Sequence, residues 1–345
     1  MKAACIREHG DLDQIRVVDI DDPVPGPGEV LIETAHAALN HLDHFVVRGW
    51  PGLNLDMPHV LGADGAGIVK ETGPDVSVLA PGDAVTINPG LSCGTCDRCL
   101  AGLQNLCKSF GIMGEHRNGT FATKFVVPAV NALRVPAGFL LDVAAAAPLV
   151  FLTAWRMVVT RARVKPGDIV LVHGAGGGLA TAAIQVAKLH GATVIATTST
   201  PDKMERARLL GASHVINYKE EPGYGARVFK ELTGKRGVDV VIDSVGAPTF
   251  GDSIRLLRPD GVLVIPGATA GPNVDLNLRQ VFWKQLRVVG STMATQGEFR
   301  DAMRFVFSGH IVPVIDRTFP LEEAKEAETY LASGAQFGKV LLAMP

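Results

Sequence analysis

The stretch Asp168–Gln185, with the sequence DIVLVHGAGGGLATAAIQ, decides how the second half of this chain folds. Residues Ile169–His173 predict a strand, the small residues Gly174–Ala180 predict a tight turn, and helical spacing follows. Backbone without bulky side chains lets a pyrophosphate approach the helix N-terminus, where N–H groups and the positive end of the dipole attract it. The stretch therefore predicts a dinucleotide site, provided that its surroundings have the matching pattern.

The region after Pro148 has that pattern, because strand-like and helix-like segments alternate along it. The helical segments are Leu179–His190, Pro201–Leu210 and Tyr224–Leu232. The segments rich in β-branched residues are Ile169–His173, Thr193–Thr197, Val215–Asn217, Val238–Asp243, Val262–Pro266 and Arg287–Gly290. This alternation predicts an α/β fold with a doubly wound parallel sheet, whose ligand lies at the carboxyl ends of the strands.

The first part of the chain has a different pattern of secondary structure. From Met1 to about Val130, short strand-like runs such as Leu31–Ala35 and Ala66–Glu71 are separated by turns rich in Pro and Gly. A helix is expected over Asn40–Arg48, and the tail from Ile311 returns to strand-like character around a helix. We therefore predict a β-rich domain formed by residues 1–149 and 311–345, with a dinucleotide-binding domain inserted at residues 150–310.

Length, charge and the N-terminus limit the possible classes of protein. At 345 residues the chain exceeds the usual size of one hydrophobic core, so two domains are expected. The net charge of −2 gives no basic surplus for nucleic acid or an anionic membrane surface. The first residues lack the apolar run of a signal peptide, and no apolar stretch is long enough to span a bilayer. We expect a cytoplasmic protein.

Four of the five cysteines lie close together in the sequence. Cys93, Cys96, Cys99 and Cys107 have the spacing C-x2-C-x2-C-x7-C. Four thiolates at such spacing can surround one tetrahedral Zn²⁺, and with four protein ligands no position remains for a substrate. We predict one structural zinc ion per chain, against the alternatives of free cysteines or an iron–sulfur cluster. Cys5 lies apart and is expected to be a small buried residue.

Short motifs are spread over nearly the whole length of the chain. They are PGEV (27–30), ALNHLD (38–43), LGADGAGIV (61–69), PGDAV (81–85), LTAW (152–155), VHGAGG (172–177), INY (216–218) and FGKV (337–340). In this order and spacing the motifs resemble the medium-chain dehydrogenase/reductase superfamily, and more closely its quinone oxidoreductase branch. The resemblance implies a GroES-like β-rich domain and a Rossmann domain.

The resemblance also shows what this chain lacks. Zinc-dependent alcohol dehydrogenases of the superfamily bind a catalytic zinc through three residues, which match Asn40, Ala63 and Leu149 here. Ala63 and Leu149 cannot ligate a metal, so zinc-assisted alcohol oxidation is disfavoured. An alternative is a rebuilt metal site from the metal-capable residues nearby, which are His41, Asp43, His44, His59 and Asp64.

Candidate catalytic residues follow from the same match. Asn40 corresponds to an asparagine of the quinone reductase pattern that could donate a hydrogen bond to the substrate oxygen, or it could simply cap a loop. Asp43 matches a residue common in the branch without catalytic zinc. Phe45 and Trp50 stand where relatives often have tyrosines. They could stack on a flat acceptor or belong to the core, and protonation would then come from solvent.

The cofactor residues include the glycine-turn positions and the ends of the following strands. Ala196–Thr200 has no acidic residue for ribose hydroxyls, while Lys203 follows closely and Tyr218 matches the family tyrosine beside a 2′-phosphate. We therefore predict NADPH over NADH, the alternative being that Lys203 is solvated. The full predicted set is Thr153, Ala175, Gly176, Gly177, Gly178, Leu179, Ala180, Thr198, Ser199, Lys203, Tyr218, Ser244, Gly267 and Ala268.

These observations predict an oxidoreductase that reduces quinones or α,β-unsaturated carbonyls with NADPH and without catalytic zinc. The alternatives are a zinc-type alcohol dehydrogenase with an atypical metal site and an NADPH-binding protein without turnover. The expected partner is a small electrophilic substrate, with no nucleic acid and no membrane. We also expect a homodimer or homotetramer, in which Arg287–Gly290 pairs as an edge strand.

Overall fold

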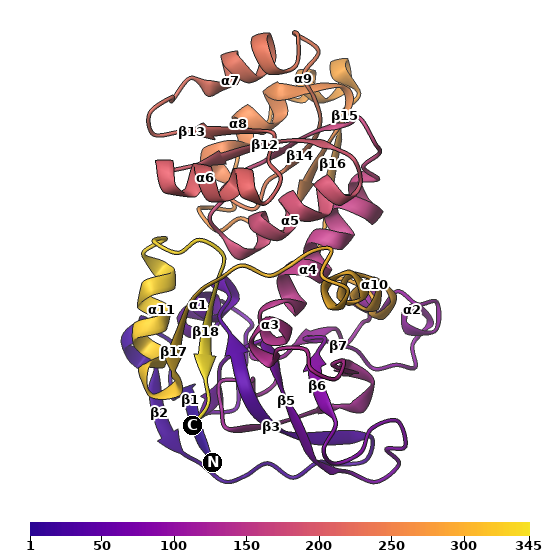
Figure 1. The fold of residues 1–345 in the computed structure, drawn as a ribbon, viewed down its shortest axis with the longest axis vertical. Helices are drawn as coiled ribbons and strands as arrows, with labels where there is room; N and C mark the ends of the chain where they lie inside the picture. The colour runs from indigo at the N-terminus through magenta and orange to yellow at the C-terminus, as the bar shows by residue number, and fades with distance from the viewer. The chain divides into compact units, whose positions relative to one another are not determined.

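A computed structural model describes all 345 residues, which divide into two compact units. One unit is Met1–Leu149 together with Ala294–Pro345, and the other is Val150–Met293. Figure 1 shows the elements of both units along the chain. No helix has the length and apolar character needed to cross a membrane.

The second unit is built on a six-stranded sheet in which every neighbouring pair is parallel. The strand order is β13-β12-β11-β14-β15-β16, with helices on both faces (Figure 1). This arrangement confirms the predicted doubly wound parallel sheet. The strands are β11 (Ile169–Val172), β12 (Thr193–Thr198), β13 (His214–Asn217), β14 (Val238–Ile242), β15 (Leu257–Ile265) and β16 (Arg287–Gly290).

Helices in this unit follow the strands as the periodicity predicted. Buried apolar residues of the sheet, such as Leu171, Ile195 and Ile216, form one core cluster with Phe250 and Ile254 of the crossover helix α8. The helices are α5 (Gly178–Leu189), α6 (Pro201–Leu209), α7 (Tyr224–Arg227), α8 (Ala247–Leu256) and α9 (Leu278–Lys284). Strand β15 begins five residues before the predicted Val262, because its first residue Leu257 already pairs with Val238 of β14.

The first unit holds a seven-stranded sheet that the two ends of the chain build together. The order is β10-β6-β5-β3-β18-β17, and β9 also pairs with β3. The members are β3 (Glu29–Ala38), β5 (Asp64–Thr72), β6 (Ala84–Ile87), β9 (Lys124–Pro128), β10 (Ala132–Arg134), β17 (Ile315–Pro320) and β18 (Lys339–Ala343). The C-terminal strand β18 pairs antiparallel with β3, so the tail completes this sheet.

Smaller strands and several helices complete the first unit. The strands are β1 (Lys2–Ile6), β2 (Arg16–Asp19), β4 (His59–Val60), β7 (Gly90–Leu91) and β8 (Gly111–Ile112). The helices are α1 (His41–Arg48), α2 (Asp97–Leu100), α3 (Leu141–Ala146), α10 (Gln296–Phe307) and α11 (Ala324–Ala332), while α4 (Pro148–Trp155) begins at the boundary.

The second boundary between the units differs from the predicted one. The sequence places residues up to 310 in the dinucleotide domain, whereas the contacts divide the chain after Met293. The reason is the packing of α10. Its Phe307 ring lies 5.1 Å from the ring of Phe139, and the Gln296 N–H donates to the Gln104 side chain at 3.3 Å. These contacts place α10 in the first unit, which local sequence patterns could not indicate because both partners lie far away in the sequence.

Candidate functional site

The glycine turn has the geometry that the sequence predicted for a phosphate site. Gly174 has φ +71°, which favours glycine, and the Gly176 and Gly177 N–H groups both point back to its carbonyl oxygen. Helix α5 begins directly after Gly177, which is its N-cap residue. The first-turn N–H groups of an α-helix have no partner within the helix, so this end can receive an anion.

Lys203 lies against this turn although it belongs to α6. A methyl carbon placed on Gly176 would be 3.3 Å from Lys203 Nζ, and the lysine side chain is buried. The N-cap residue Thr200 accepts the Lys203 N–H at 3.3 Å and so fixes where α6 begins. The structure therefore does not place Lys203 on a solvated helix face.

Residues at the carboxyl ends of the next strands surround the same edge of the sheet. Thr198 ends β12, and its carbonyl accepts the Tyr218 N–H at 3.0 Å, which places Tyr218 next to that strand end. Tyr218 is 41% exposed. Neither Thr198 nor its neighbour Ser199 carries a charge that would repel a phosphate.

The loops after β14 and β15 are joined to each other. The Thr269 N–H donates to Ser244 O at 3.0 Å, and a Cβ on Gly246 would lie 2.4 Å from Gly271 O. Gly246 has φ +95°, so only glycine suits this close approach. Ser244 and the predicted pair Gly267 and Ala268 thus belong to one loop cluster at the carboxyl edge.

Asp243 orders the loop after β14 and ties it to α8. Its carboxylate accepts the N–H of Val245 and Gly246 at 2.9 and 3.1 Å, and the hydroxyls of Thr249 and Ser253 at 2.8 and 2.6 Å. With both oxygens engaged, Asp243 has a loop-ordering role. Thr153, the remaining predicted cofactor residue, is buried within α4.

The predicted catalytic residues lie in the first unit, on and around α1. Asn40 is its N-cap and forms a capping box with Asp43, whose Oδ2 accepts the Asn40 N–H at 2.7 Å. Asp43 is fully buried, and its other oxygen has no hydrogen-bond partner. Both side chains therefore fix the start of the helix.

The side-chain amide of Asn40 is also used within the protein. Its Nδ2 donates to Ala38 O at 3.2 Å and to Asp64 Oδ2 at 2.9 Å, while its Oδ1 accepts from Lys339 Nζ at 2.6 Å. A lysine ammonium group only donates, so this contact fixes which end of the amide is oxygen. Because both amide hydrogens are engaged, Asn40 has none left to donate to a substrate oxygen.

A buried group of acids and histidines lies between α1 and α11. His44 Nε2 lies 2.7 Å from Glu328 Oε2, and the His41 and His44 rings meet edge to face with centroids 5.8 Å apart. Burial, and after it the charge of Glu328, raises the pKa of Asp43 well above its usual value. Burial alone does the same for the pKa of Glu328. Burial and the nearby His44 lower the pKa of His41 to about 4, so this histidine is neutral at pH 7.

Phe45 and Trp50 are not core residues. Their exposed fractions are 38% and 40%, although other apolar residues of α1, such as Val46 and Val47, are fully buried. Exposed aromatic rings on the same short segment provide a surface on which a flat molecule can stack.

The four clustered cysteines bring their sulfur atoms together as the spacing predicted. The distances are 3.5 Å for Cys93–Cys107, 3.6 Å for Cys96–Cys99, 3.8 Å for Cys96–Cys107 and 3.9 Å for Cys93–Cys99. Four thiolates about 2.3 Å from a central zinc ion would be about 3.8 Å apart. The cluster therefore fits one tetrahedral zinc ion and leaves no room for several irons.

The backbone around the cluster favours the thiolate form that zinc requires. The N–H groups of Thr95 and Cys96 lower the pKa of Cys93 to about 6. Cys107 Sγ accepts the N–H groups of Cys93 and Ser109 at 3.4 and 3.3 Å. Burial raises the pKa of Cys99 to about 11, so this thiol has to lose its proton when zinc binds, and the cluster is a structural zinc site.

The alternative set of metal ligands does not come together. Among all residues, only the four cysteines form a group of three or more potential ligands within metal-binding distance of one another. Asp64 is engaged by Asn40 and Lys339, and His59 Nε2 lies 3.0 Å from Gly114 O.

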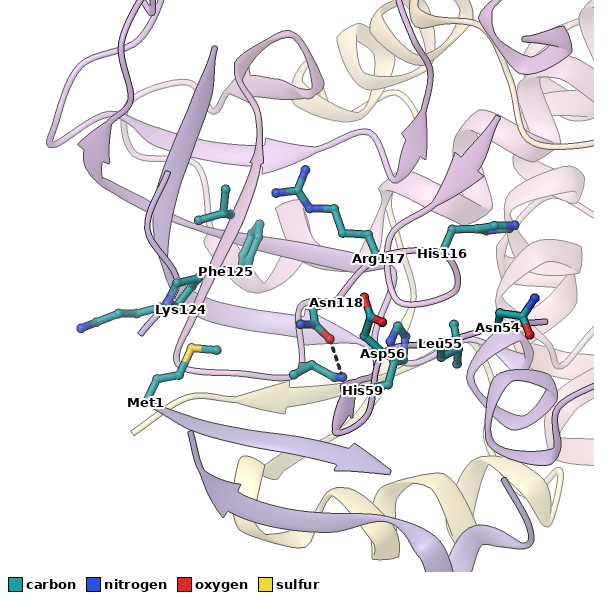
Figure 2. A pocket seen from close by; sticks show the side chains of 14 residues that line it. Met1, Asn54, Leu55, Asp56, His59, His116, Arg117, Asn118, Lys124 and Phe125 are labelled. Atoms are coloured by element: carbon teal, nitrogen blue, oxygen red, sulfur yellow. Dashed lines mark hydrogen bonds between the residues drawn. The ribbon is translucent and has the colours of Figure 1, made fainter. Parts of the chain in front are cut away.

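His59 instead lines a polar pocket of about 290 Å³ on the first unit (Figure 2). The cations that line the pocket have partners within the protein. Arg117 pairs with Glu29 at 2.6 Å, and both Lys124 and the N-terminal ammonium group pair with Asp22. Asn118 Oδ1 accepts the Val60 N–H at 2.9 Å, the dashed line in Figure 2. The pocket therefore offers no unpaired cation among these groups for a ligand.

Two residues of the buried network did not enter the predicted site. Lys339 belongs to the FGKV motif but not to the predicted site, and Glu328 belongs to neither. One signal was available for Lys339, because a lysine at the start of the apolar strand KVLLA requires buried partners. Nothing comparable marks Glu328, whose neighbours on α11 include exposed acids.

Two family profiles match the chain over most of its length. The alcohol dehydrogenase GroES-like domain matches residues 26–137, and the zinc-binding dehydrogenase profile matches residues 178–308. The first range contains the four clustered cysteines, and the second begins at the first residue of α5 and includes strands β12 to β16.

Individual proteins are similar over almost the entire chain. A zinc-type alcohol dehydrogenase-like protein of Schizosaccharomyces pombe is 34% identical, covering 96% of this chain and 95% of that protein. An acryloyl-coenzyme A reductase of Metallosphaera sedula is 32% identical, covering 99% of both. A crystal structure described as an NAD-dependent alcohol dehydrogenase is 46% identical, with a TM-score of 0.96 and complete coverage of both chains.

We predict that replacing one cysteine of the cluster removes the metal. Cys96→Ser should reduce the zinc content, measured by mass spectrometry of purified protein, from about one ion per chain to near zero. The melting temperature should fall by roughly 10 °C, because the ion holds a loop with little core of its own. Cys5→Ala, outside the cluster, should keep its zinc. A Cys96→Ser protein that retains one zinc ion would contradict the assignment.

We also predict a pH-dependent effect at Glu328. The pKa of Glu328 in the folded protein is raised above the usual 4.5. The contribution of this group to the free energy of unfolding is therefore fully present below pH 4.5 and is lost as the pH rises through the raised pKa. Glu328→Gln keeps the shape and a hydrogen-bond donor for His44 without a charge. The variant should match the wild type near pH 4.5 and melt roughly 5 °C higher at pH 8.

Melting curves at the two pH values measure this effect. Glu326→Gln, on the exposed face of the same helix, serves as the control and should show no such difference. A Glu328→Gln protein that is less stable than the wild type at pH 8 would show that the carboxylate itself stabilises the fold.

Proposed function

Because the chain belongs to the medium-chain dehydrogenase/reductase superfamily, we propose that it reduces α,β-unsaturated carbonyl compounds or quinones by hydride transfer from NADPH, without a catalytic zinc ion. The superfamily and its members' names support an NAD(P)H-dependent oxidoreductase. The similarity to an acryloyl-coenzyme A reductase supports activated alkenes as the substrate class.

The observation that carries this proposal is the absence of a ligand set at the positions that match the catalytic zinc. Asn40, Ala63 and Leu149 occupy them, and only Asn40 has a polar side chain. That side chain is bonded to Asp64 and Lys339. Without a Lewis acid, an alcohol is a poor hydride donor, whereas an activated alkene is reduced by hydride transfer alone.

The chain's own residues then have to orient the acceptor and stabilise the charge that develops on it. A nicotinamide bound at the glycine turn would supply a hydride from C4 to the alkene β-carbon, which would leave an enolate with its negative charge on the carbonyl oxygen. Phe45 and Trp50 provide exposed rings for a flat acceptor. Asn40 and Asp43 are positioning residues at the start of α1. The α-carbon of the reduced substrate then takes its proton from water.

Cofactor choice rests on the residues around the turn. The ammonium group of Lys203 lies beside Gly176, and Thr198, Ser199 and Tyr218 lie at the end of β12 without a carboxylate among them. A 2′-phosphate at this edge would gain a charge-assisted hydrogen bond, which supports NADPH over NADH. The name of the 46% identical structure instead refers to NAD, so the cofactor requires direct measurement.

A homodimer or homotetramer is part of the same proposal. Strand β16 lies at the edge of its sheet, and Val288 on it is 42% exposed. Trp283, Phe282 and Leu278 on the preceding helix α9 are 83%, 63% and 68% exposed. Such an apolar edge suits burial against a second copy, and sedimentation velocity would detect a single-chain mass if the proposal is wrong.

The function is tested by NADPH oxidation with a panel of quinones, enones and an acryloyl thioester. We expect turnover with at least one class and no effect of a chelator that leaves the structural zinc in place. Alcohol-driven reduction of NADP⁺ that a chelator abolishes would support a rebuilt metal site instead. Tight NADPH binding without any transfer would support a binding protein.

The stacking of the substrate on Phe45 is tested with a matched control variant. Phe45→Ala should raise the KM of the acceptor by roughly tenfold, because the ring contributes contact area to a flat molecule. Phe229→Ala, in the second unit and 39% exposed against 38% for Phe45, should leave the KM unchanged.

Cofactor preference is tested by Lys203→Met. Losing the ammonium group should raise the KM for NADPH by roughly thirtyfold and change that for NADH less than twofold. Lys188→Met, at the far end of α5, should change neither value. Equal kcat/KM values of the wild type with NADH and NADPH would overturn the preference.

A further inference from the structure

Glu115 is a half-buried carboxyl group without a hydrogen-bond partner. Its side chain is 12% exposed, and no donor of the protein bonds to either oxygen. Neither oxygen is among the fully buried polar atoms that lack a partner, so both stay accessible from outside the protein. A carboxyl group in this situation can exchange protons with water and with a bound molecule.

The neighbouring histidine does not donate to this carboxyl group. His116 Nδ1 lies 3.8 Å from Glu115 Oε1, beyond hydrogen-bond distance, and the same nitrogen accepts the Ile112 N–H at 3.3 Å. A ring nitrogen that accepts a hydrogen bond carries no proton of its own. Burial raises the pKa of Glu115 above its usual value, and the proximity of His116 offsets part of this rise. The protonated carboxyl group is therefore favoured more than in an exposed glutamate.

The backbone holds Glu115 in place without help from its side chain. Glu115 lies in a tight turn in which the Gly114 N–H donates to Arg117 O at 2.8 Å. The N–H groups of Glu115 and His116 both donate to Ile112 O, at 3.1 and 2.9 Å. Because these bonds fix the turn, the carboxyl group is available to act on a ligand.

This turn packs against Gly62, just before β5. Gly114 has φ +76°, and a Cβ placed on it would lie 2.5 Å from Gly62 O, so the two backbones touch. Thr120, which follows the turn, donates its N–H to Gly62 O at 3.0 Å and its hydroxyl to Asp64 O at 2.7 Å. Glu115 is thus the residue next to a direct contact with this segment.

The segment that begins at Gly62 also adjoins the start of α1. Its second residue, Ala63, matches a catalytic ligand position of the zinc-type relatives, and Asp64 accepts from the Asn40 side chain at the N-cap of α1. Phe45 on that helix offers an exposed ring to the acceptor in the proposed function. The turn described above and the start of α1 therefore contact the same short segment.

We propose that Glu115 is a catalytic residue of this reaction, the general acid that protonates the α-carbon of the enolate. The proposal rests on the proposed function, because hydride transfer to an activated alkene has to form that enolate first. A general acid in position accelerates such a step by roughly 10²–10⁴-fold.

The step balances without a further reactant. The enolate uses its electron pair to form a C–H bond at the α-carbon as the Glu115 O–H bond breaks, which leaves a carboxylate. Water then returns a proton to the accessible oxygens. Each turnover consumes one NADPH and one proton, and water remains the source of that proton.

Other groups nearby are less suited to this step. Asp43 and Glu328 are almost completely buried, and all three hydrogens of the Lys339 ammonium group are donated within the protein. Burial lowers the pKa of His41 to about 4, so this ring holds no second proton at pH 7. Among these groups and Glu115, it is Glu115 that combines a raised pKa with accessible oxygens.

The protonation of Glu115 is tested without any acceptor. An infrared difference spectrum between the wild type and Glu115→Gln should contain the C=O band of a protonated carboxyl group, and its pH titration should have a midpoint above the usual 4.5. Glu115→Gln should melt within about 2 °C of the wild type, because it loses no hydrogen bond. A midpoint at or below 4.5 would overturn the proposal.

Catalysis is tested in D2O with NADPH and the acryloyl thioester, or with the enone that the wild type reduces fastest. The wild type should place deuterium on one face of the α-carbon, since a fixed acid approaches from one side. Glu115→Gln should lower kcat about a hundredfold and distribute deuterium over both faces, because water then supplies the proton directly. If Glu115→Gln still deuterates the wild-type face alone, or loses less than about threefold in kcat, the general-acid role is wrong.

A matched control and the pattern of outcomes separate this proposal from the proposed function. Glu33→Gln, which loses an exposed ion pair with Lys70, should keep both the kcat and the face of deuteration. Turnover by the wild type with unchanged kinetics in Glu115→Gln overturns the general acid and leaves the function standing. A wild type that reduces quinones alone also overturns the general acid, because a quinone takes its protons on oxygen. No turnover with any acceptor overturns both.

Discussion

The carboxylate of Asp64 is the contact on which the start of α1, the substrate side in our proposal, depends. It is completely buried and bonded to three donors from three other segments, one of them the ammonium ion of Lys339. Removing one partner of such a pair costs about 3–5 kcal/mol, because the other charge stays in a medium of low polarity. The start of α1 is therefore held by electrostatics as well as by packing.

The same contact changes the role of Asn40. From its match to the family pattern alone, Asn40 is predicted to donate a hydrogen bond to a substrate oxygen. In the fold its two amide hydrogens go to Ala38 O and Asp64 Oδ2, and its oxygen faces Lys339. A buried amide with every strong donor engaged stabilises the site and does not serve the chemistry. The exposed rings of Phe45 and Trp50 remain as the substrate-facing groups in our proposal.

The proposed cofactor site follows from a simpler constraint. In a parallel sheet every strand ends at the same edge, so the turn after β11 and the loops after β12, β14 and β15 gather there. Asp243 orders the loop after β14 through four hydrogen bonds to that loop and to α8, and Lys203 reaches the turn from α6. The site is thus produced by topology, with individual residues adjusting charge and shape.

The sequence by itself determined the features that depend on nearby residues. The turn Gly174–Ala180, the alternating strands and helices, and the four cysteines each act within a short stretch, so spacing and residue type were sufficient. Only the tertiary structure decided the partners of Lys339, which lie 275 residues away at Asp64 and 299 at Asn40, and the contact of His44 with Glu328, 284 residues apart. It also decided that α10 packs on the first unit. A lysine in the apolar strand KVLLA indicates that buried partners are needed, but no local pattern indicates which residues they are, because burial creates such contacts only after distant segments have met.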